Sequence, residues 1–423
     1  MDHRSGLQLS EDFYREAIRP LLTKAFPGLR HAAALMGRGS EVLGFDDTMS
    51  TDHDWTARVV LHLDNADSEI VGTLQEELAG SMPPRYGGVP TNVEVATVAD
   101  YFQTQLGLDI SQQWDAYDWI SLAEHRLCEI TSGAVFHDEV GLHDIRKRLS
   151  YYPRDVWYYL LGAAWWRVHP ELNLVGRTGY VGDDVGSSLI AAEMVSALMH
   201  LSFLIERRYA PYRKWLGTAF ARLQIASNLL PKLQQVLRSQ TWQEREQALT
   251  AAYSIVAEAC NDLRLTDAVP LKHTRMWQRP FTVSWADFPT ALTAQIQDPT
   301  TRAFATNWST ASGVDQVREI LWTPRGRPAV RQLAANWLPI GDEGLPTRLT
   351  RRCWPSGGGA SPVASSVARG GPRVDIMSLI GQPDRDKRPA PTDQPDHRID
   401  RNQFQPPGHL ALGGSTGLGQ PAT

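Results

Sequence analysis

The segment from residue 39 to residue 54 constrains this chain more than any other, because it combines a Gly-Ser pair with two acids. Gly39-Ser40 is followed, after eleven residues, by Asp52-His53-Asp54. A Gly-Ser turn that opens a helix presents backbone N–H groups to an anion such as a phosphate. Side chains alternate along a strand, so the two aspartates share one face. The segment therefore predicts a phosphate-binding turn beside a pair of metal-binding carboxylates.

The first 110 residues alternate between helical and strand-like patterns. A helix is predicted over residues 10–26, with Ser10 as its N-cap, and a second over residues 67–79. Short apolar or β-branched runs predict strands over residues 32–36, 53–63 and 93–98. This order predicts a small α/β domain over residues 1–110.

Beyond residue 110 the pattern becomes helical. Helices are predicted over residues 118–131, 142–150, 153–169, 184–208, 211–226 and 228–262, with Ser111 and Asp155 as candidate caps. These segments predict a mostly α-helical domain over residues 111–322. The domain is rich in Trp and Tyr, which we expect to pack in its core or at a domain interface, with base stacking as the alternative.

The last hundred residues have a different composition. Residues 351–423 contain ten prolines and eleven glycines among 73 residues, without apolar periodicity, and this composition favours disorder. The change begins near residue 323, so we predict a disordered C-terminal tail over residues 323–423. The fold class expected for the whole chain is α+β, with a small sheet domain, a helical domain and this tail.

The composition indicates which binding partners and which cellular location to expect. A net charge of −5 and a pI near 6.2 argue against a broad basic surface for binding nucleic acid. The three cysteines are far apart in sequence, which argues against a disulfide framework or a cysteine zinc site. The most apolar stretch, residues 189–205, is interrupted by Glu193 and His200, so no membrane span is expected. These features predict a soluble cytoplasmic protein.

A third acid supports the metal-site hypothesis. Glu94 lies between Val93 and Val95, so its side chain points to the opposite face of the predicted strand. It is a candidate metal ligand or general base, because a buried carboxylate needs a partner. Together with Asp52 and Asp54 it could hold two Mg²⁺ ions. The alternatives are a solvated strand face for Glu94 and a solvated acidic loop for the two aspartates.

Other candidates lie outside these three acids. His53 is expected to face the core, and Asp46 and Asp47 are a lower-ranked alternative metal pair. Arg208 and Lys214, in a basic and aromatic segment, are candidates for binding a triphosphate or an acidic acceptor, with a solvated surface as the alternative. A glycine-rich loop predicted over residues 176–186 adds Arg177 and Asp183-Asp184 as cleft candidates.

These motifs resemble the nucleotidyltransferase (polymerase-β-like) superfamily, through Gly39-Ser40, Asp52-His53-Asp54 and Glu94. Four longer segments are similar to a bacterial family known as domain of unknown function 4037: GSEVLGFDDTMSTDHDW (39–55), GAVFHD (133–138), YYPRDVW (151–157) and YAPYRKW (209–215). The similarity extends over roughly residues 10–320. It implies a small mixed sheet with flanking helices, and a helical domain that closes over a nucleotide.

The resemblance also implies roles for the site residues. Asp52, Asp54 and Glu94 would hold Mg²⁺, and Gly39-Ser40 would bind the phosphates. His53 departs from the superfamily pattern, which has an apolar residue between the acids. The resemblance identifies no acceptor.

The expected function is Mg²⁺-dependent transfer of a nucleoside monophosphate from an NTP to a hydroxyl group of a small molecule or protein, with release of pyrophosphate. The alternative is a catalytically inactive nucleotide-binding or regulatory protein of the same fold. Modification of RNA ends is a weaker option, because the acidic net charge opposes it.

Overall fold

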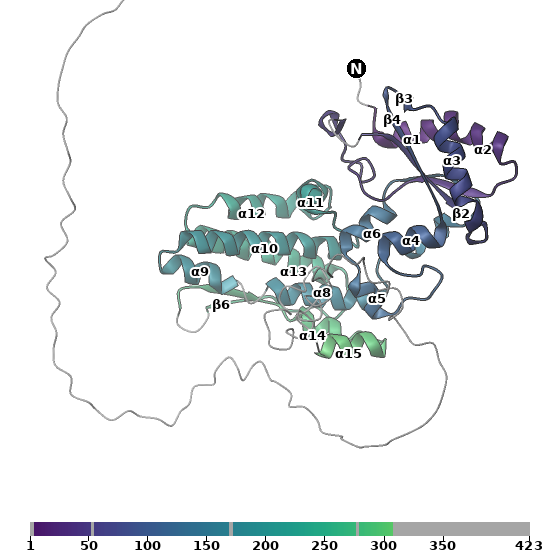
Figure 1. Ribbon diagram of the computed structural model, residues 1–423. Helices are drawn as coiled ribbons and strands as arrows, with labels where there is room; N and C mark the ends of the chain where they lie inside the picture. Colours follow the sequence, from purple (N-terminus) through teal and green to yellow (C-terminus); the bar gives the residue numbers. More distant parts are fainter. Residues whose placement is uncertain (1–3, 52–54, 169–171, 276–278, 308–423) are drawn as a thin grey trace, which may run out of the picture. The chain divides into compact units, whose positions relative to one another are not determined.

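The computed structural model describes residues 4–51, 55–168, 172–275 and 279–307, all within one compact unit (Figure 1). A five-stranded mixed sheet is formed mainly by the N-terminal part, and helices dominate the rest. The predicted α+β class, with a mixed sheet, flanking helices and a helical region after it, is confirmed. Asp52, His53 and Asp54, and the tail predicted over residues 323–423, lie outside the described residues.

The N-terminal helix is longer than predicted and contains a π-helical turn. It consists of α1 (Gly6–Phe13), the π turn η1 (Tyr14–Ile18) and α2 (Arg19–Ala25). The N-cap is Ser5, whose side chain accepts a hydrogen bond from the Gln8 amide, whereas Ser10 is buried inside the helix. The prediction of Ser10 as the cap was therefore wrong. Pro20, which lacks an N–H to bond the carbonyl of residue 16, lies two residues after this π turn.

The sheet has the strand order β3-β4-β2-β1-β5. Its strands are β1 (His31–Leu35), β2 (Ala57–Leu63), β3 (Arg85–Tyr86), β4 (Val89–Thr97) and β5 (Ala134–Asp138). The β2–β4 pair is parallel and the other pairs are antiparallel. Strands β1, β2 and β4 overlap the predicted strands, but β5 was not predicted. The sheet therefore draws one strand from beyond residue 110, where the sequence indicates helices.

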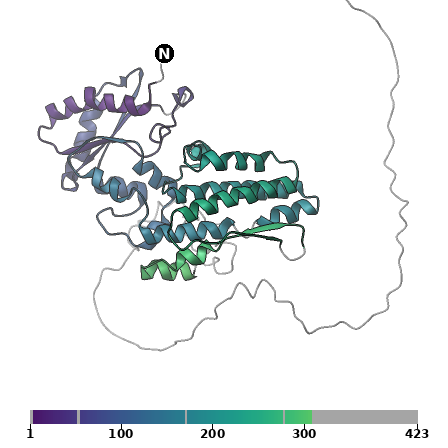
Figure 2. The same ribbon diagram turned by 180° about the vertical axis from the view of Figure 1, so that it is seen from behind.

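Side-chain alternation gives the sheet two apolar faces. Ala33, Val59 and Leu61 pack with α1 and with α3 (Val71–Ser81) in one core. Ala32 and Val60 point to the other face, where they pack with α4 (Val98–Leu106) and the helical region. Figures 1 and 2 show the sheet between these layers. The second face is the one that leads to the candidate site.

The helical region contains more and shorter helices than predicted. The segments predicted as single helices over residues 118–131 and 228–262 are each divided in two. Asp115 and Thr241, not Ser111, begin helices through capping boxes. The helices are α5 (Ala116–Ser121), α6 (Glu124–Thr131), α7 (Leu142–Arg148), α8 (Arg154–Val168), α9 (Leu172–Tyr180), α10 (Asp184–Ile205), α11 (Arg213–Phe220), α12 (Ala226–Arg238), α13 (Trp242–Asp262), α14 (Phe288–Thr293) and α15 (Pro299–Asn307).

The remaining elements are short. An unpredicted hairpin is formed by β6 (Lys272–Arg275) and β7 (Thr282–Trp285), and 3₁₀ turns occupy η2 (Thr48–Thr51) and η3 (Asn65–Ile70). The segment predicted as a glycine-rich loop over residues 176–186 is partly helical, because α9 extends to Tyr180.

Many aromatic residues of the helical region lie in its core. Trp165 is 1% exposed and stacks on Phe288 with ring centroids 4.5 Å apart. Trp157 is buried, and its indole Nε1 donates to the Leu204 carbonyl oxygen at 2.8 Å. Such rings are closed to a nucleic-acid base, so core packing, and not base stacking, is their role.

Helix α10 is the one helix of the described residues that is long and apolar enough to cross a membrane by length and composition. It packs against α8, α9 and α13, and 56% of its most apolar window is buried inside the structure. This burial is typical of the core helix of a soluble protein.

A histidine is buried in the centre of the sheet. His62 is fully buried on β2, edge-on to the Tyr101 ring at 4.6 Å. Neither of its ring nitrogens has a hydrogen-bond partner among the described residues. Burial lowers the pKa of His62 to about 3, because the imidazolium form would lose its hydration.

This buried histidine predicts a loss of stability in acid. The unfolded chain binds a proton at His62 below pH ~6.5, whereas the folded chain does so only below its own, depressed pKa. Stability therefore falls as the pH drops from about 6.5 towards 3, by about 2–3 kcal/mol at pH 4.5. We expect His62→Leu to remove this part of the pH dependence in urea unfolding measured from pH 7.5 to 4.5. Equal pH slopes in the two proteins would contradict the assignment, since all other titrating groups are shared.

Candidate nucleotide-binding cleft

The Gly39-Ser40 turn follows β1, as predicted, but no helix begins after it within the described residues 40–47. The Phe45 amide donates to the Ser40 carbonyl at 2.9 Å, closing a single turn. Gly44, with φ of +66°, ends that turn. The expected helix N-terminus is therefore absent here, and any anion at Gly39-Ser40 would meet a short turn without a helix dipole behind it.

A cleft of about 450 Å³ lies beside this turn. It contains three of the predicted site residues, Gly39, Ser40 and Lys214. The sheet contributes Arg58 of β2 and Asn92 of β4, which pair with each other in the parallel register. The full lining is Arg38, Gly39, Ser40, Glu41, Ser50, Trp55, Thr56, Arg58, Asn92, Tyr212 and Lys214.

An ion pair crosses the floor of the cleft. One guanidinium nitrogen of Arg58 lies 2.8 Å from the Glu41 carboxylate and donates to the Arg38 carbonyl oxygen at 2.6 Å. The Glu41 carboxylate folds back over Gly39, where a Cβ atom would lie 2.2 Å from it. Gly39 also has φ of +142°, a conformation that favours glycine. Glu41 thus places a negative group where the sequence predicts phosphate.

Residues in and just after α11 fix the turn from the helical side. The indole Nε1 of Trp215 donates to the Ser40 hydroxyl oxygen at 3.1 Å. The Trp215 ring stacks on Phe45 with centroids 5.4 Å apart. Arg222 lies over the other part of the turn, 4.1 Å from the Phe45 ring centroid, and donates to the Gly44 carbonyl at 3.1 Å. Tyr212 and Lys214 line the cleft from this helical side, and Arg58 and Asn92 line it from the sheet.

Glu94 is exposed on β4, two residues beyond Asn92 on the same face. In the sheet register it lies opposite Val60, one step inward from the Arg58–Asn92 pair along that face. Burial, reinforced by the nearby charge of Glu94, raises the pKa of the Tyr101 hydroxyl. Glu94 is thus a solvent-accessible carboxylate next to the cleft. The placement of its predicted partners Asp52 and Asp54 lies outside the described residues.

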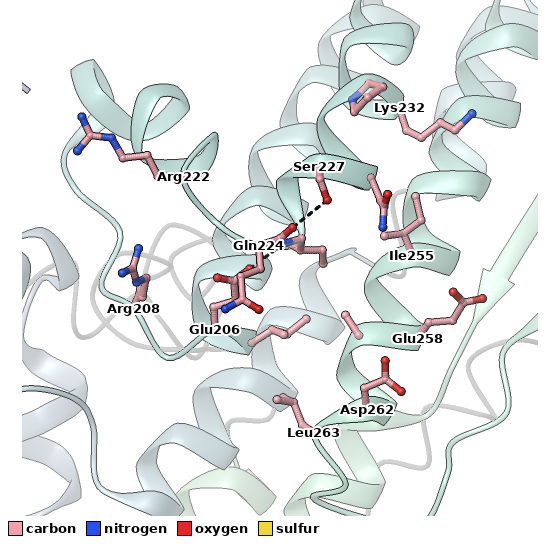
Figure 3. A pocket seen from close by; sticks show the side chains of 15 residues that line it. Glu206, Arg208, Arg222, Gln224, Ser227, Lys232, Ile255, Glu258, Asp262 and Leu263 are labelled. Carbon is pink, nitrogen blue, oxygen red and sulfur yellow. Dashed lines mark hydrogen bonds between the residues drawn. The ribbon is translucent and has the colours of Figure 1, made fainter.

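Arg208 lies apart from the Gly39-Ser40 turn. It lines a separate cavity of about 1030 Å³ between the end of α10 and helices α12 and α13 (Figure 3). That cavity mixes cations with acids, among them Lys232 and Glu258. Of the two basic residues predicted to bind a triphosphate, only Lys214 lines the Gly39-Ser40 cleft.

Three of the other candidate acids hold loops and helix ends in place. Asp46 accepts a hydrogen bond from the Gly6 amide at 2.8 Å, which ties the loop to the start of α1. Asp47 accepts from the amides of residues 49 and 50 and so begins the η2 turn. Asp183 caps α10 by accepting from the Gly186 amide at 2.8 Å. None of these acids lines the Gly39-Ser40 cleft.

Sequence reasoning missed two cleft residues that carried a detectable signal. Arg58 lies within the mostly apolar strand β2, and Asn92 lies two residues before Glu94 on the same face of β4, so the alternation argument that identified Glu94 extends to both. Glu41 and Trp55 carried no such signal, because loop geometry alone brings them to the cleft.

Comparison with known proteins supports the family resemblance. Residues 119–216 match a family described as "Domain of unknown function (DUF4037)". The DUF4037 match begins in α5 and ends in α11, so it includes β5 and the Tyr212–Trp215 wall of the cleft. It stops short of Gly39-Ser40.

Two further comparisons concern solved structures and curated proteins. A crystal structure of a nucleotidyltransferase-like protein from Exiguobacterium sibiricum 255-15 is 11% identical to this chain, with a TM-score of 0.28. The match covers 64% of this chain and 98% of that one. No curated protein matches this chain.

Proposed function

We propose that this protein binds an NTP in the Gly39-Ser40 cleft and transfers its nucleoside monophosphate to a hydroxyl group of a small molecule or protein. The observation that carries the proposal is the composition of the cleft. A Gly-Ser turn and the cations Arg58 and Lys214 line one cleft beside a mixed sheet, and the carboxylate of Glu94 lies one step further along the same sheet face. These are the groups that phosphate binding and phosphoryl transfer require.

The chain's own residues supply most of the positioning. The Gly39-Ser40 turn has backbone amides and one hydroxyl for the phosphates, and Lys214 offers an exposed ammonium group from the opposite wall. Arg58 is planar and forked, so it can hold two phosphate oxygens at once. Glu94, two residues beyond the cleft residue Asn92 on the same face of β4, would accept the proton of an acceptor hydroxyl. Catalysis would rest mainly on such positioning and on charge stabilisation.

Carboxylates are the fitting donors for Mg²⁺, and the chain offers three of them. Glu94 is exposed on β4, one step inward from the Arg58–Asn92 pair, and Asp52 and Asp54 precede β2 in the sequence. Mg²⁺ prefers oxygen ligands and retains several waters, so it suits an open, solvent-accessible site of this kind. When bound, Mg²⁺ supplies charge stabilisation to the triphosphate.

A specific observation favours the second candidate, a nucleotide-binding protein without turnover. Glu41 already neutralises Arg58 at 2.8 Å, and Trp215 already bonds the Ser40 hydroxyl. A nucleotide must displace the Glu41 carboxylate to take the guanidinium nitrogen of Arg58 that Glu41 now holds. A protein that uses this exchange to report nucleotide binding, without transferring the nucleotide, would have the same cleft.

The first experiment is calorimetric titration of each NTP in the presence of Mg²⁺. We expect binding by the wild type and at least about 100-fold weaker binding by the Asp52→Asn/Asp54→Asn double variant, because the metal ligands lose their charge. Circular dichroism should show the same fold in both proteins. An NTP affinity equal in the two would remove the metal site from the proposal.

Glu41→Gln is the matched charge variant for the same titration. It preserves the size of the side chain but removes the charge that competes with phosphate for Arg58. We expect this variant to bind the NTP more tightly than wild type, whereas a nucleotide bound elsewhere would be insensitive to it. Transfer activity then separates the enzyme from the nucleotide-binding protein.

A further inference from the structure

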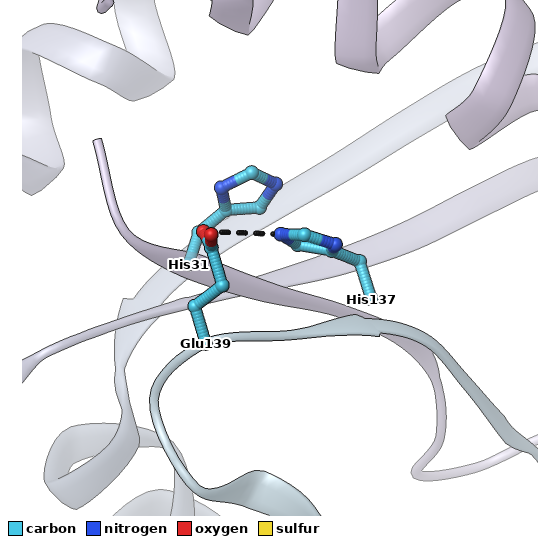
Figure 4. Close-up of side chains that lie close together, drawn as sticks. All are labelled: His31, His137 and Glu139. Atoms are coloured by element: carbon cyan, nitrogen blue, oxygen red, sulfur yellow. Dashed lines mark ion pairs between the residues drawn. The ribbon is translucent and has the colours of Figure 1, made fainter. Parts of the chain in front are cut away.

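A second cluster of ligating side chains lies on the sheet face opposite the Arg58–Asn92 pair. It consists of His31 in β1, His137 in β5 and Glu139 just after β5. One ligating atom from each residue lies within 4.8 Å of those of the other two (Figure 4). Among the described residues, this is the group of three or more His, Cys, Asp or Glu side chains that meets this distance.

Strand register and a bulge explain why these side chains meet. His137 pairs with Ala33, and the Glu139 amide donates to the His31 carbonyl at 3.0 Å, so both residues continue the β1–β5 ladder. The register shifts between Ala33 and Ala34, which leaves Phe136 as the extra residue of a bulge. Bulges re-aim side chains, and here the bulge turns His137 towards the face of His31.

His31 is prepared to act as a ligand through Nε2. Its Nδ1 lies 3.2 Å from the Leu29 carbonyl oxygen, so Nδ1 carries the proton and the lone pair is on Nε2. Burial lowers the pKa of His31, which keeps the ring neutral at pH 7. A backbone carbonyl behind a neutral imidazole is the usual support of a metal-binding histidine.

The other two residues supply charge and access. The Nε2 atom of His137 lies 3.1 Å from the Glu139 carboxylate, and the rings of His137 and His31 have centroids 4.6 Å apart. The side chain of Glu139 is 48% exposed, so the cluster is open to solvent on that side. Two imidazoles and one carboxylate with an open side are the donor set of many zinc and other transition-metal sites.

We propose that His31, His137 and Glu139 form a binding site for a divalent transition-metal ion of the Zn²⁺ class. Zinc–ligand bonds of about 2.0–2.2 Å place neighbouring donors roughly 3.3 Å apart, so small rotations would suffice to close the cluster. The site is separate from the Mg²⁺ site proposed in the cleft, because its nitrogen donors select a softer ion. The inference does not rest on the nucleotidyltransferase proposal.

Tyr14 is the residue that competes with the metal. Its hydroxyl lies 2.9 Å from Nε2 of His31, the atom that would bind the ion. Burial raises the pKa of Tyr14 to about 12, so the hydroxyl stays protonated and donates to Nε2. Metal binding must break this bond. Tyr14 lies in the π turn η1, an irregularity that often marks functional sites in helices.

The test is titration of untagged, chelator-treated full-length protein with Zn²⁺, followed by calorimetry and by competition with a chromogenic chelator. We expect one site that His137→Ala and Glu139→Gln each weaken at least about 100-fold. These two residues are preferred over buried His31, whose loss endangers folding. His273→Ala, which removes a histidine from the distant β6–β7 hairpin, is the matched control and should leave the site unchanged.

Two further variants make the assignment specific. Tyr14→Phe removes the competing hydrogen bond and should bind Zn²⁺ at least as tightly as wild type. The Asp52→Asn/Asp54→Asn variant should still bind Zn²⁺ at this cluster. The Zn²⁺ result is therefore independent of the nucleotide proposal. The proposal is overturned by a folded wild type that binds no Zn²⁺, by sites that survive both His137→Ala and Glu139→Gln, or by weaker binding in Tyr14→Phe.

Discussion

Asp54→Asn is expected to lower nucleotide transfer at least about 1000-fold, equivalent to roughly 4 kcal/mol of transition-state stabilisation. The substitution keeps the shape of the side chain and removes its charge. A metal-bound triphosphate owes several kcal/mol of charge stabilisation to the ion, and the aspartates are its proposed ligands. The measurement is transfer of labelled nucleotide to a panel of hydroxyl-bearing acceptors, including the protein itself.

Asp47→Asn is the matched control for this prediction, since Asp47 is an acid of the same loop. The asparagine keeps the side-chain oxygen that accepts from Met49 and Ser50, so η2 should persist. We expect near wild-type transfer from this variant. The reverse result, with activity lost in Asp47→Asn and kept in Asp54→Asn, would move the metal site to the Asp46-Asp47 pair.

The sequence predicted the part of the fold that depends on local periodicity. Strands β1, β2 and β4 carry apolar or β-branched runs, and the long helices α8, α10 and α13 fall within segments predicted to be helical. Strand β5 escaped prediction, because its five residues include His137 and Asp138 and its pairing with β1 spans about a hundred residues of chain. Such pairing is decided by tertiary contacts, which no short window contains.

The candidate site likewise contains residues that sequence motifs identify and residues that only the tertiary structure brings to it. Gly39, Ser40 and Lys214 were identified from motifs, and all three line the cleft. The Arg58–Glu41 ion pair was not identified, since it depends on how the loop after β1 folds back over the sheet. Arg208 was chosen for its basic neighbours, but it projects into another cavity. Sequence proximity to Lys214 therefore does not determine on which surface Arg208 lies.

The same long-range pairing predicts the largest effect on stability, at Gly133. This glycine precedes β5 and has φ of +70°. A Cβ atom here would lie 2.0 Å from the carbonyl oxygen of Leu35, a fully buried residue of β1. We expect Gly133→Ala to lower the free energy of unfolding by about 4 kcal/mol, because strand β5 must separate from β1 to admit the methyl group and the left-handed backbone adds about 1 kcal/mol.

Gly141→Ala separates these two causes. Gly141 follows β5, has φ of +83°, and has no atom within 4 Å of the position of an added Cβ. Its substitution should therefore cost only the backbone conformation, about 1 kcal/mol. Urea unfolding of both variants measures the difference. Equal losses would show that β5 is not held against β1 as closely as the structure has it. The His31–His137–Glu139 cluster would then lose its support, because the register between β1 and β5 brings these three residues together.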